Sequence, residues 1–138
     1  MIPVDPGTRE TLQRLAADAI LAVHALFVAF VVIGQLAILI GLLARRRWAR
    51  NFRFRVVHLA CVLYVTVQTW LGITCPLTTW ENALRATAGE RGYEYGFIAG
   101  WLDRLIFYQA EPWVFTLLYS LFGVAVVVTW IAAPPRRR

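Results

Sequence analysis

The histidines and amides inside the long apolar segments are the residues best placed for chemistry. His24 could ligate a metal, bind a ligand or move protons, because its imidazole titrates near neutral pH. Gln35 follows eleven positions later, close to three turns at about 3.6 residues per turn, so the two side chains would share one helix face. Such residues mark functional sites in membranes, but they also hold helices together. The sequence leaves both readings open.

Side chains from two other apolar segments are expected at about the depth of His24, counting along each helix from its outer end. An imidazole, an amide and a hydroxyl at one depth can satisfy each other's hydrogen bonds. We therefore expect these groups to face the interior of a helix bundle. The candidate polar site consists of His24, Gln35, Gln68, Tyr119 and Ser120.

His58 is not expected to join this site. If the first two apolar segments form antiparallel helices, His24 and His58 differ in depth by about 20 to 25 Å at 1.5 Å per residue. A haem or metal bridging them is therefore excluded, and the sequence predicts no cofactor and no metal site. His58 follows Arg53 and Arg55 closely in the sequence, near the end of a predicted span. We therefore interpret it as an anchor that reaches water.

A second group of polar residues follows the second apolar segment. This external motif contains Cys75, Thr78, Glu81, Asn82 and Arg85. Thr78 and Glu81 have the spacing of a capping box, and Glu81 and Arg85 the spacing of an ion pair on one helix. The functional alternative uses Cys75, Glu81 and Arg85 at the membrane rim.

The same stretch predicts a short amphipathic helix. Gly89 is suited to terminate it. Its apolar face is predicted to contain Trp80, Ala83, Leu84 and Ala88.

The sequence resembles a family of bacterial membrane proteins known as domain of unknown function 2784. The resemblance rests on Cys75, Pro76, Leu77 and Thr78, then Glu81 with Asn82 and Leu84 with Arg85, on the later Gly-Tyr and Gly-Phe-Ile motifs, and on His24 with Phe27, Val28, Phe30 and Gly34. It extends from about Val23 to Val124. The resemblance implies a short multi-pass membrane protein and assigns no catalytic residue.

The composition also favours a membrane protein. Of the 138 residues, 59% are hydrophobic, and the mean hydropathy is +0.60. The net charge of +6 comes largely from two arginine blocks, 45–55 and 136–138, which flank apolar segments instead of covering a polar face. This pattern is typical of membrane flanks and argues against nucleic-acid binding.

The predicted fold is all-α, with three transmembrane helices and amphipathic interfacial helices on the outer side, in a single membrane domain. The segment Phe97 to Gln109 is too short to cross a membrane and has an amphipathic pattern. The predicted segments are an amphipathic lead-in (1–18), a first span (19–44), a cytoplasmic arginine loop (45–55), a second span (56–74), an external interfacial segment (75–111), a third span (112–133) and a cytoplasmic arginine tail (134–138).

The function predicted from the sequence is that of an accessory subunit or a binder of an apolar, lipid-like ligand. Membrane lipids and either copies of itself or a partner membrane protein are the expected partners, because three helices bury little of one another's surface. The alternative is a redox or transfer activity that uses His24 and Cys75 at the outer face. Lysine is absent, which excludes Schiff-base chemistry on a lysine.

The two arginine blocks predict the orientation. If the chain crosses a bacterial cytoplasmic membrane three times, both arginine blocks lie on its cytoplasmic side. The N-terminus is then outside the cell membrane and the C-terminus in the cytoplasm. Reporter fusions at the C-terminus should therefore be active only in the cytoplasm. A C-terminal fusion active in the periplasm would contradict this topology, as would a cysteine introduced at Ala99 that is shielded at the bilayer midplane.

Overall fold

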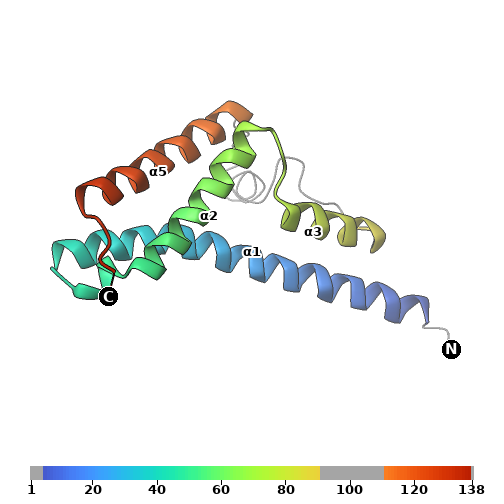
Figure 1. The fold of residues 1–138 in the computed structure, drawn as a ribbon. Helices are drawn as coiled ribbons and strands as arrows, with labels where there is room; N and C mark the ends of the chain where they lie inside the picture. The colour runs from blue at the N-terminus through green and yellow to red at the C-terminus, as the bar shows by residue number, and fades with distance from the viewer. Residues whose placement is uncertain (1–4, 91–110, 138) are drawn as a thin grey trace. The chain divides into compact units, whose positions relative to one another are not determined.

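A computed structural model describes residues 5–90 and 111–137. Over these residues the chain is all-helical, with α1 (Pro6–Leu43), a 3-10 turn η1 (Arg47–Arg50), α2 (Phe52–Trp70), α3 (Pro76–Thr87) and α5 (Pro112–Ala132) (Figure 1). Two of them, α1 and α5, are long and apolar enough to cross a membrane. α2 has 19 residues, but Arg53, Arg55 and Gln68 make it less apolar. The predicted helix from Phe97 to Gln109 lies outside the described residues.

The chain divides into two compact units. Unit 1 comprises Met1–Leu26 and Thr74–Ala110, and unit 2 comprises Phe27–Ile73 and Glu111–Arg138. α1 contributes its first half to unit 1 and its second half to unit 2, and it is one continuous helix through the predicted boundary between lead-in and first span.

Glycines set the ends of α2 and α3. Gly72 and Gly89 have φ angles of 66° and 73°, a left-handed conformation that costs glycine nothing. Each lets the next residue's N–H bond back into the last turn, Ile73 to the Gln68 carbonyl and Glu90 to the Arg85 carbonyl. Gly89 ends α3 as predicted, in the position after the C-cap residue Ala88. α2 covers Phe52–Trp70 and not 56–74, because Gly72 ends it early and the Asn51 side chain caps its start at Phe54 N.

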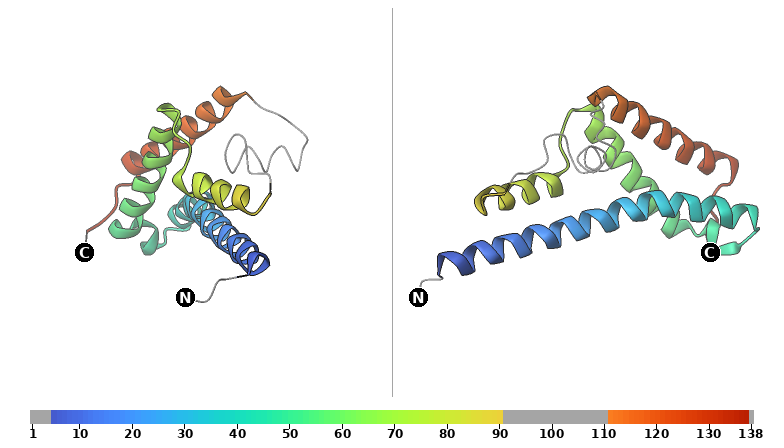
Figure 2. Two further views of the ribbon diagram at one scale, coloured as in Figure 1. Left: turned by 90° about the vertical axis from the view of Figure 1, so that its right-hand side faces the viewer. Right: turned by 180° about the vertical axis from the view of Figure 1, so that it is seen from behind.

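Small residues and polar pairs join the helices of unit 2. α5 runs back along α2 in the opposite direction (Figure 2). Thr66 Oγ1 lies against Gly123, and its hydroxyl is 3.5 Å from the Tyr119 carbonyl oxygen. The second half of α1 is linked to α5 by Gln35, whose amide donates to Thr129 Oγ1 at 2.9 Å in a buried position.

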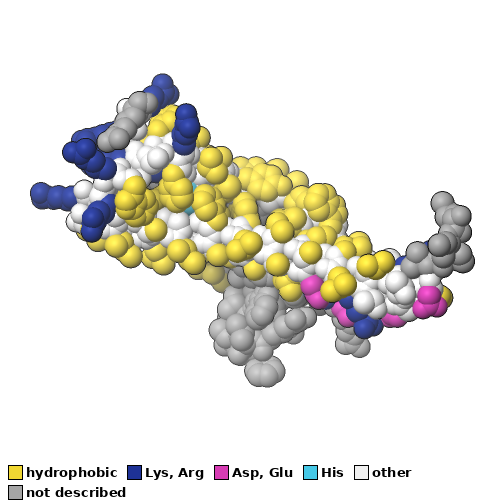
Figure 3. All heavy atoms as spheres, turned by 90° about the horizontal axis from the view of Figure 1, so that it is seen from below, with side chains coloured by type: hydrophobic (Ala, Val, Ile, Leu, Met, Phe, Trp, Pro, Cys, Tyr) yellow, Lys and Arg dark blue, Asp and Glu magenta, His cyan; other side chains and the backbone are white. Residues whose placement is uncertain are grey.

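The described residues expose many large apolar side chains and bury several polar ones, the reverse of the pattern in a soluble protein. Leu43, Leu26 and Trp70 are among the most exposed side chains, whereas Gln35, Arg55, His58 and Thr129 are buried in unit 2. Figure 3 shows hydrophobic side chains over most of the visible surface of unit 2, with arginines gathered at one end.

His58 is packed against the backbone of α1. Its Nε2 is 2.8 Å from the Val31 carbonyl oxygen, which identifies Nε2 as the protonated nitrogen. Phe30 and Phe54 flank the ring, and its exposure is 0%. The interpretation of His58 as an anchor that reaches water is therefore wrong: the ring fills the space that Gly34 leaves open.

Gly34→Ala should destabilise unit 2 by about 1 to 3 kcal/mol through overpacking, although alanine favours a helix by about 1 kcal/mol over glycine. The added Cβ would lie 2.9 Å from His58 Cδ2, and the ring cannot move away without losing its hydrogen bond to the Val31 carbonyl. Gly123→Ala is the matched control, because its Cβ would meet a rotatable hydroxyl, Thr66 Oγ1, at 3.2 Å. Thermal unfolding in detergent measures both variants. A Gly34→Ala protein as stable as the wild type would contradict this packing.

Candidate functional site: a polar seam in unit 1

The first half of α1 and α3 pack antiparallel in unit 1 and form a seam of polar contacts. Thr78 lies opposite His24, Arg85 opposite Asp18, and Glu90 opposite Arg14. As α3 advances along the chain, its partners on α1 recede, which defines the antiparallel direction. Ala17 and Ala88 are 0% and 2% exposed, and their small side chains allow the close approach.

Arg85 is the centre of the seam. Its guanidinium donates to three carboxylates, Glu81 Oε1 at 2.8 Å, Glu90 Oε2 at 2.9 Å and Asp18 Oδ1 at 2.9 Å. Burial opposes the charge on Arg85, but the hydrogen bonds to Glu81, Glu90 and Asp18 outweigh it and raise the pKa of Arg85. The guanidinium therefore stays positive at any pH at which the protein is folded.

Glu81 is the most deeply buried carboxylate of the seam. Its side chain is 0% exposed, and while Oε1 accepts from Arg85, Oε2 is buried without a hydrogen-bond partner. A buried acceptor without a donor costs about 1 to 3 kcal/mol. An oxygen of this kind is unusual in a folded protein and is suited to accept a hydrogen bond from a ligand.

The face that α3 buries is mostly polar, and its largest apolar side chain, Trp80, points outward. Thr78, Glu81 and Ala88 are buried and Arg85 is largely so, whereas Trp80 is 59% exposed. The predicted capping box is wrong. Helix α3 starts at Pro76 with Cys75 as its N-cap and no side-chain cap, so Thr78 and Glu81 lie inside the helix and turn towards α1.

His24 joins the seam at its other end. Its Nδ1 is 3.5 Å from Thr78 Oγ1, and the ring is 6% exposed. The structure thus brings together His24 from one predicted group and Thr78, Glu81 and Arg85 from the other. Cys75 is half-buried at the helix start, and Asn82 is half-buried one position after Glu81.

The other members of the predicted polar site lie in unit 2, each with a partner there. Gln35 bonds Thr129, Gln68 Nε2 donates to Tyr64 Oη at 3.0 Å, and the Ser120 hydroxyl accepts from Trp70 Nε1 at 2.9 Å. Their grouping with His24 stays a prediction, as does the redox or transfer alternative that uses His24 and Cys75.

Sequence reasoning missed Asp18, Glu90 and Arg14 as members of the seam. Glu90 bridges the two arginines, because its Oε1 accepts from Arg14 Nε at 3.2 Å while its Oε2 accepts from Arg85. The available signal was the position of Asp18, an acidic residue directly before the first apolar segment. An acid at that position needs either water or a cation.

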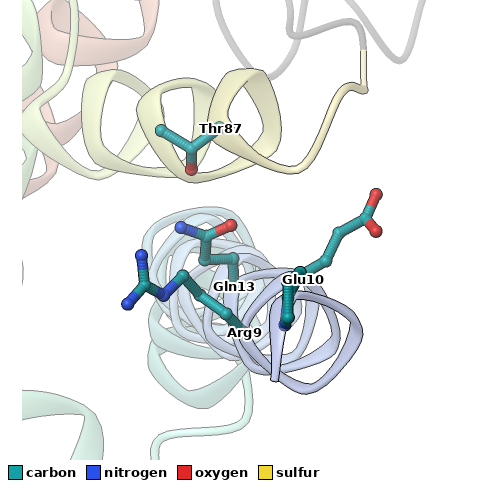
Figure 4. Close-up of a pocket in the computed structure, with 5 residues that line it drawn as sticks. Arg9, Glu10, Gln13 and Thr87 are labelled. Carbon is teal, nitrogen blue, oxygen red and sulfur yellow. The ribbon is translucent and has the colours of Figure 1, made fainter. Parts of the chain in front are cut away.

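An open hollow of about 490 Å³ lies beside the seam, where α1 begins and α3 ends. Pro6, Arg9, Glu10, Gln13 and Thr87 line it. Figure 4 shows Gln13 pointing towards Thr87, with the Arg9 and Glu10 side chains extending to opposite sides. Glu10 is paired with Arg14 at 3.1 Å, so this ion pair links the hollow to the seam.

Removing Arg85 should cost more stability than removing the charge of Glu81. Arg85→Gln leaves the Glu81 carboxylate buried without a cation and should cost about 3 to 5 kcal/mol. Glu81→Gln should cost less, because Arg85 keeps Asp18 and Glu90. Glu90→Gln, at a side chain 35% exposed, is the control and should cost at most about 1 kcal/mol. Chemical unfolding in detergent would refute this order if Arg85→Gln were the mildest of the three.

Comparison with known proteins gives one match. No curated protein and no solved structure matches the chain. The family model described as "Protein of Unknown function (DUF2784)" matches residues 14–135, which include every residue of the seam described above. The resemblance seen in the sequence is therefore confirmed, and this all-helical chain belongs to the DUF2784 family.

Proposed function

We propose that this chain is a membrane-embedded binding protein for a lipid-like ligand, whose polar head is held in the seam between α1 and α3. The observation that carries the proposal is Glu81 Oε2, a carboxylate oxygen that is buried and has no hydrogen-bond donor. A hydroxyl or amine on the ligand would supply that donor and remove the cost of leaving it unpaired.

The charge of the seam favours a donor head over an anionic one. Three carboxylates, from Asp18, Glu81 and Glu90, surround Arg85, and only Glu90 has a second arginine. A phosphate or carboxylate head would be repelled by this excess of negative charge, whereas a hydroxyl or ammonium group would be attracted. His24 and Thr78 add a neutral donor and acceptor pair at the end of the same seam.

The apolar exterior supports a ligand with a hydrocarbon tail. α3 directs Trp80 outward and its polar side chains inward, so a head group bound at Glu81 would leave its tail among apolar surroundings. Sites for small molecules commonly combine a mostly apolar lining with a few placed polar groups. Membrane lipids and a second copy or a partner membrane protein remain the proposed partners.

The proposed setting is the bacterial cytoplasmic membrane, crossed three times by α1, α2 and α5. α2 would be the third span because it runs antiparallel to α5 and bonds it along its length, from Trp70 with Ser120 to Arg55 with Ala133. The arginine blocks would then face the cytoplasm, and the seam would lie at the outer rim with the N-terminus.

Binding of matched amphiphiles tests the function. Purified protein in maltoside micelles should bind a long-chain alcohol and a long-chain amine saturably, and the corresponding methyl ester, which has no donor, much more weakly. Glu81→Leu should reduce alcohol binding by about 10-fold or more, since a hydrogen bond to a charged group is lost.

Glu90→Gln is the control for this experiment, because Glu90 lies in the same network but is already paired on both oxygens. It should bind the alcohol as the wild type does. Circular dichroism establishes that each variant is folded. Equal binding of alcohol and methyl ester, or unchanged binding by folded Glu81→Leu, would overturn the proposal.

A further inference from the structure

Unit 2 contains a buried arginine whose hydrogen bonds are incomplete. Arg55, in the first turn of α2, is 1% exposed. Its Nη1 donates to the Ala133 carbonyl at the end of α5, and its guanidinium lies 5.3 Å from the centre of the Trp130 ring. These contacts fix the position of the guanidinium plane and use one of its edges.

The opposite edge makes no hydrogen bond to the described residues. Both Nε and Nη2 of Arg55 are buried and have no hydrogen-bond partner. These two nitrogens belong to one side of the guanidinium, where their N–H bonds are parallel. Two parallel N–H donors match the spacing of two oxygens of a phosphate or carboxylate.

The sequence of unit 2 offers no carboxylate side chain for this edge. Its only acidic residue is Glu111, directly before α5, whereas Arg55 contacts the last turn of that helix. The length of α5 separates them by about 30 Å at 1.5 Å per residue.

Further positive charge surrounds Arg55. The charge of Arg50 acts against that of Arg55, and Arg137 lies over the Phe52 ring at 4.7 Å. Two buried donors on one edge, in an arginine-rich region without a matching acid, are suited to an anion from outside unit 2.

We propose that the Nε and Nη2 edge of Arg55 binds a phosphate oxyanion at the arginine-rich end of unit 2. The phosphate of a lipid head group and free inorganic phosphate share this chemistry. The atoms that cover the edge must shift to admit it. The chain after α5 passes this end of unit 2, where the Arg136 N–H donates to the Arg50 carbonyl and Arg136 forms an isolated bridge with Asn51.

The test uses the purified chain in maltoside micelles, which contain no phosphate. The thermal unfolding midpoint is followed while either a short-chain phosphatidylglycerol or inorganic phosphate is added, with the matching diacylglycerol as a tail-only control. For the wild type the midpoint should rise saturably with a phosphate probe and stay unchanged with diacylglycerol. A response to the lipid alone assigns a head group, and a response to both assigns a free oxyanion.

Two variants make the test specific. Arg55→Lys keeps the charge but loses the paired donors, so it should bind the phosphate probe about 10- to 100-fold more weakly. Arg53→Gln, on an exposed residue of the same turn, removes one charge and should respond as the wild type does. The proposal is overturned if neither phosphate probe moves the wild-type midpoint, or if folded Arg55→Lys responds as strongly as the wild type.

Discussion

The contact between Arg85 and Glu81 is the interaction on which unit 1 depends. Glu81 is fully buried, so its charge is tolerated only because a guanidinium lies 2.8 Å away and is itself held by Asp18 and Glu90. Burying a charge without a partner costs several kcal/mol, and a buried pair is stable only when its remaining hydrogen bonds are made. Every carboxylate oxygen that faces Arg85 accepts a hydrogen bond from it. Glu81 Oε2 is buried and accepts none.

The helices of unit 2 are joined mainly by neutral polar groups, and small residues let these helices approach closely. Gln35 bonds Thr129, and His58 Nε2 bonds the Val31 carbonyl, while His58 Nδ1 is buried without a hydrogen-bond partner. Gly34 and Gly123 bring these groups within reach, because a side chain at either position would fill the space that His58 or Thr66 occupies. Interhelical hydrogen bonds between closely packed backbones are the contacts expected when the surroundings are as apolar as the helix surfaces.

The two units differ in the sign of their uncompensated charge. Unit 1 gathers carboxylates around one arginine, and one carboxylate oxygen lacks a donor. In unit 2 arginines gather without a nearby acid, and two nitrogens of Arg55 lack an acceptor. A buried polar atom without a partner is rare in native proteins and calls for an explanation, such as strain, a chemical role, or a water or ion that completes it. The chemistry proposed for each unit follows from which atom is left unpaired.

The sequence by itself determined the helical class, the family, the bounds of α5 and the end of α3, because apolar runs of about 20 residues, Pro112 and Gly89 act locally. It also singled out His24, Glu81 and Arg85 by residue type. Only the tertiary structure decided which face of α3 is buried. Periodicity identifies two faces but not which one packs inward, and for α3 the polar face does, since Asp18 and Arg14 on α1 are there to satisfy it. The burial of His58 was likewise decided by Gly34, 24 positions away in the sequence, because a contact between helices depends on the shape of both surfaces.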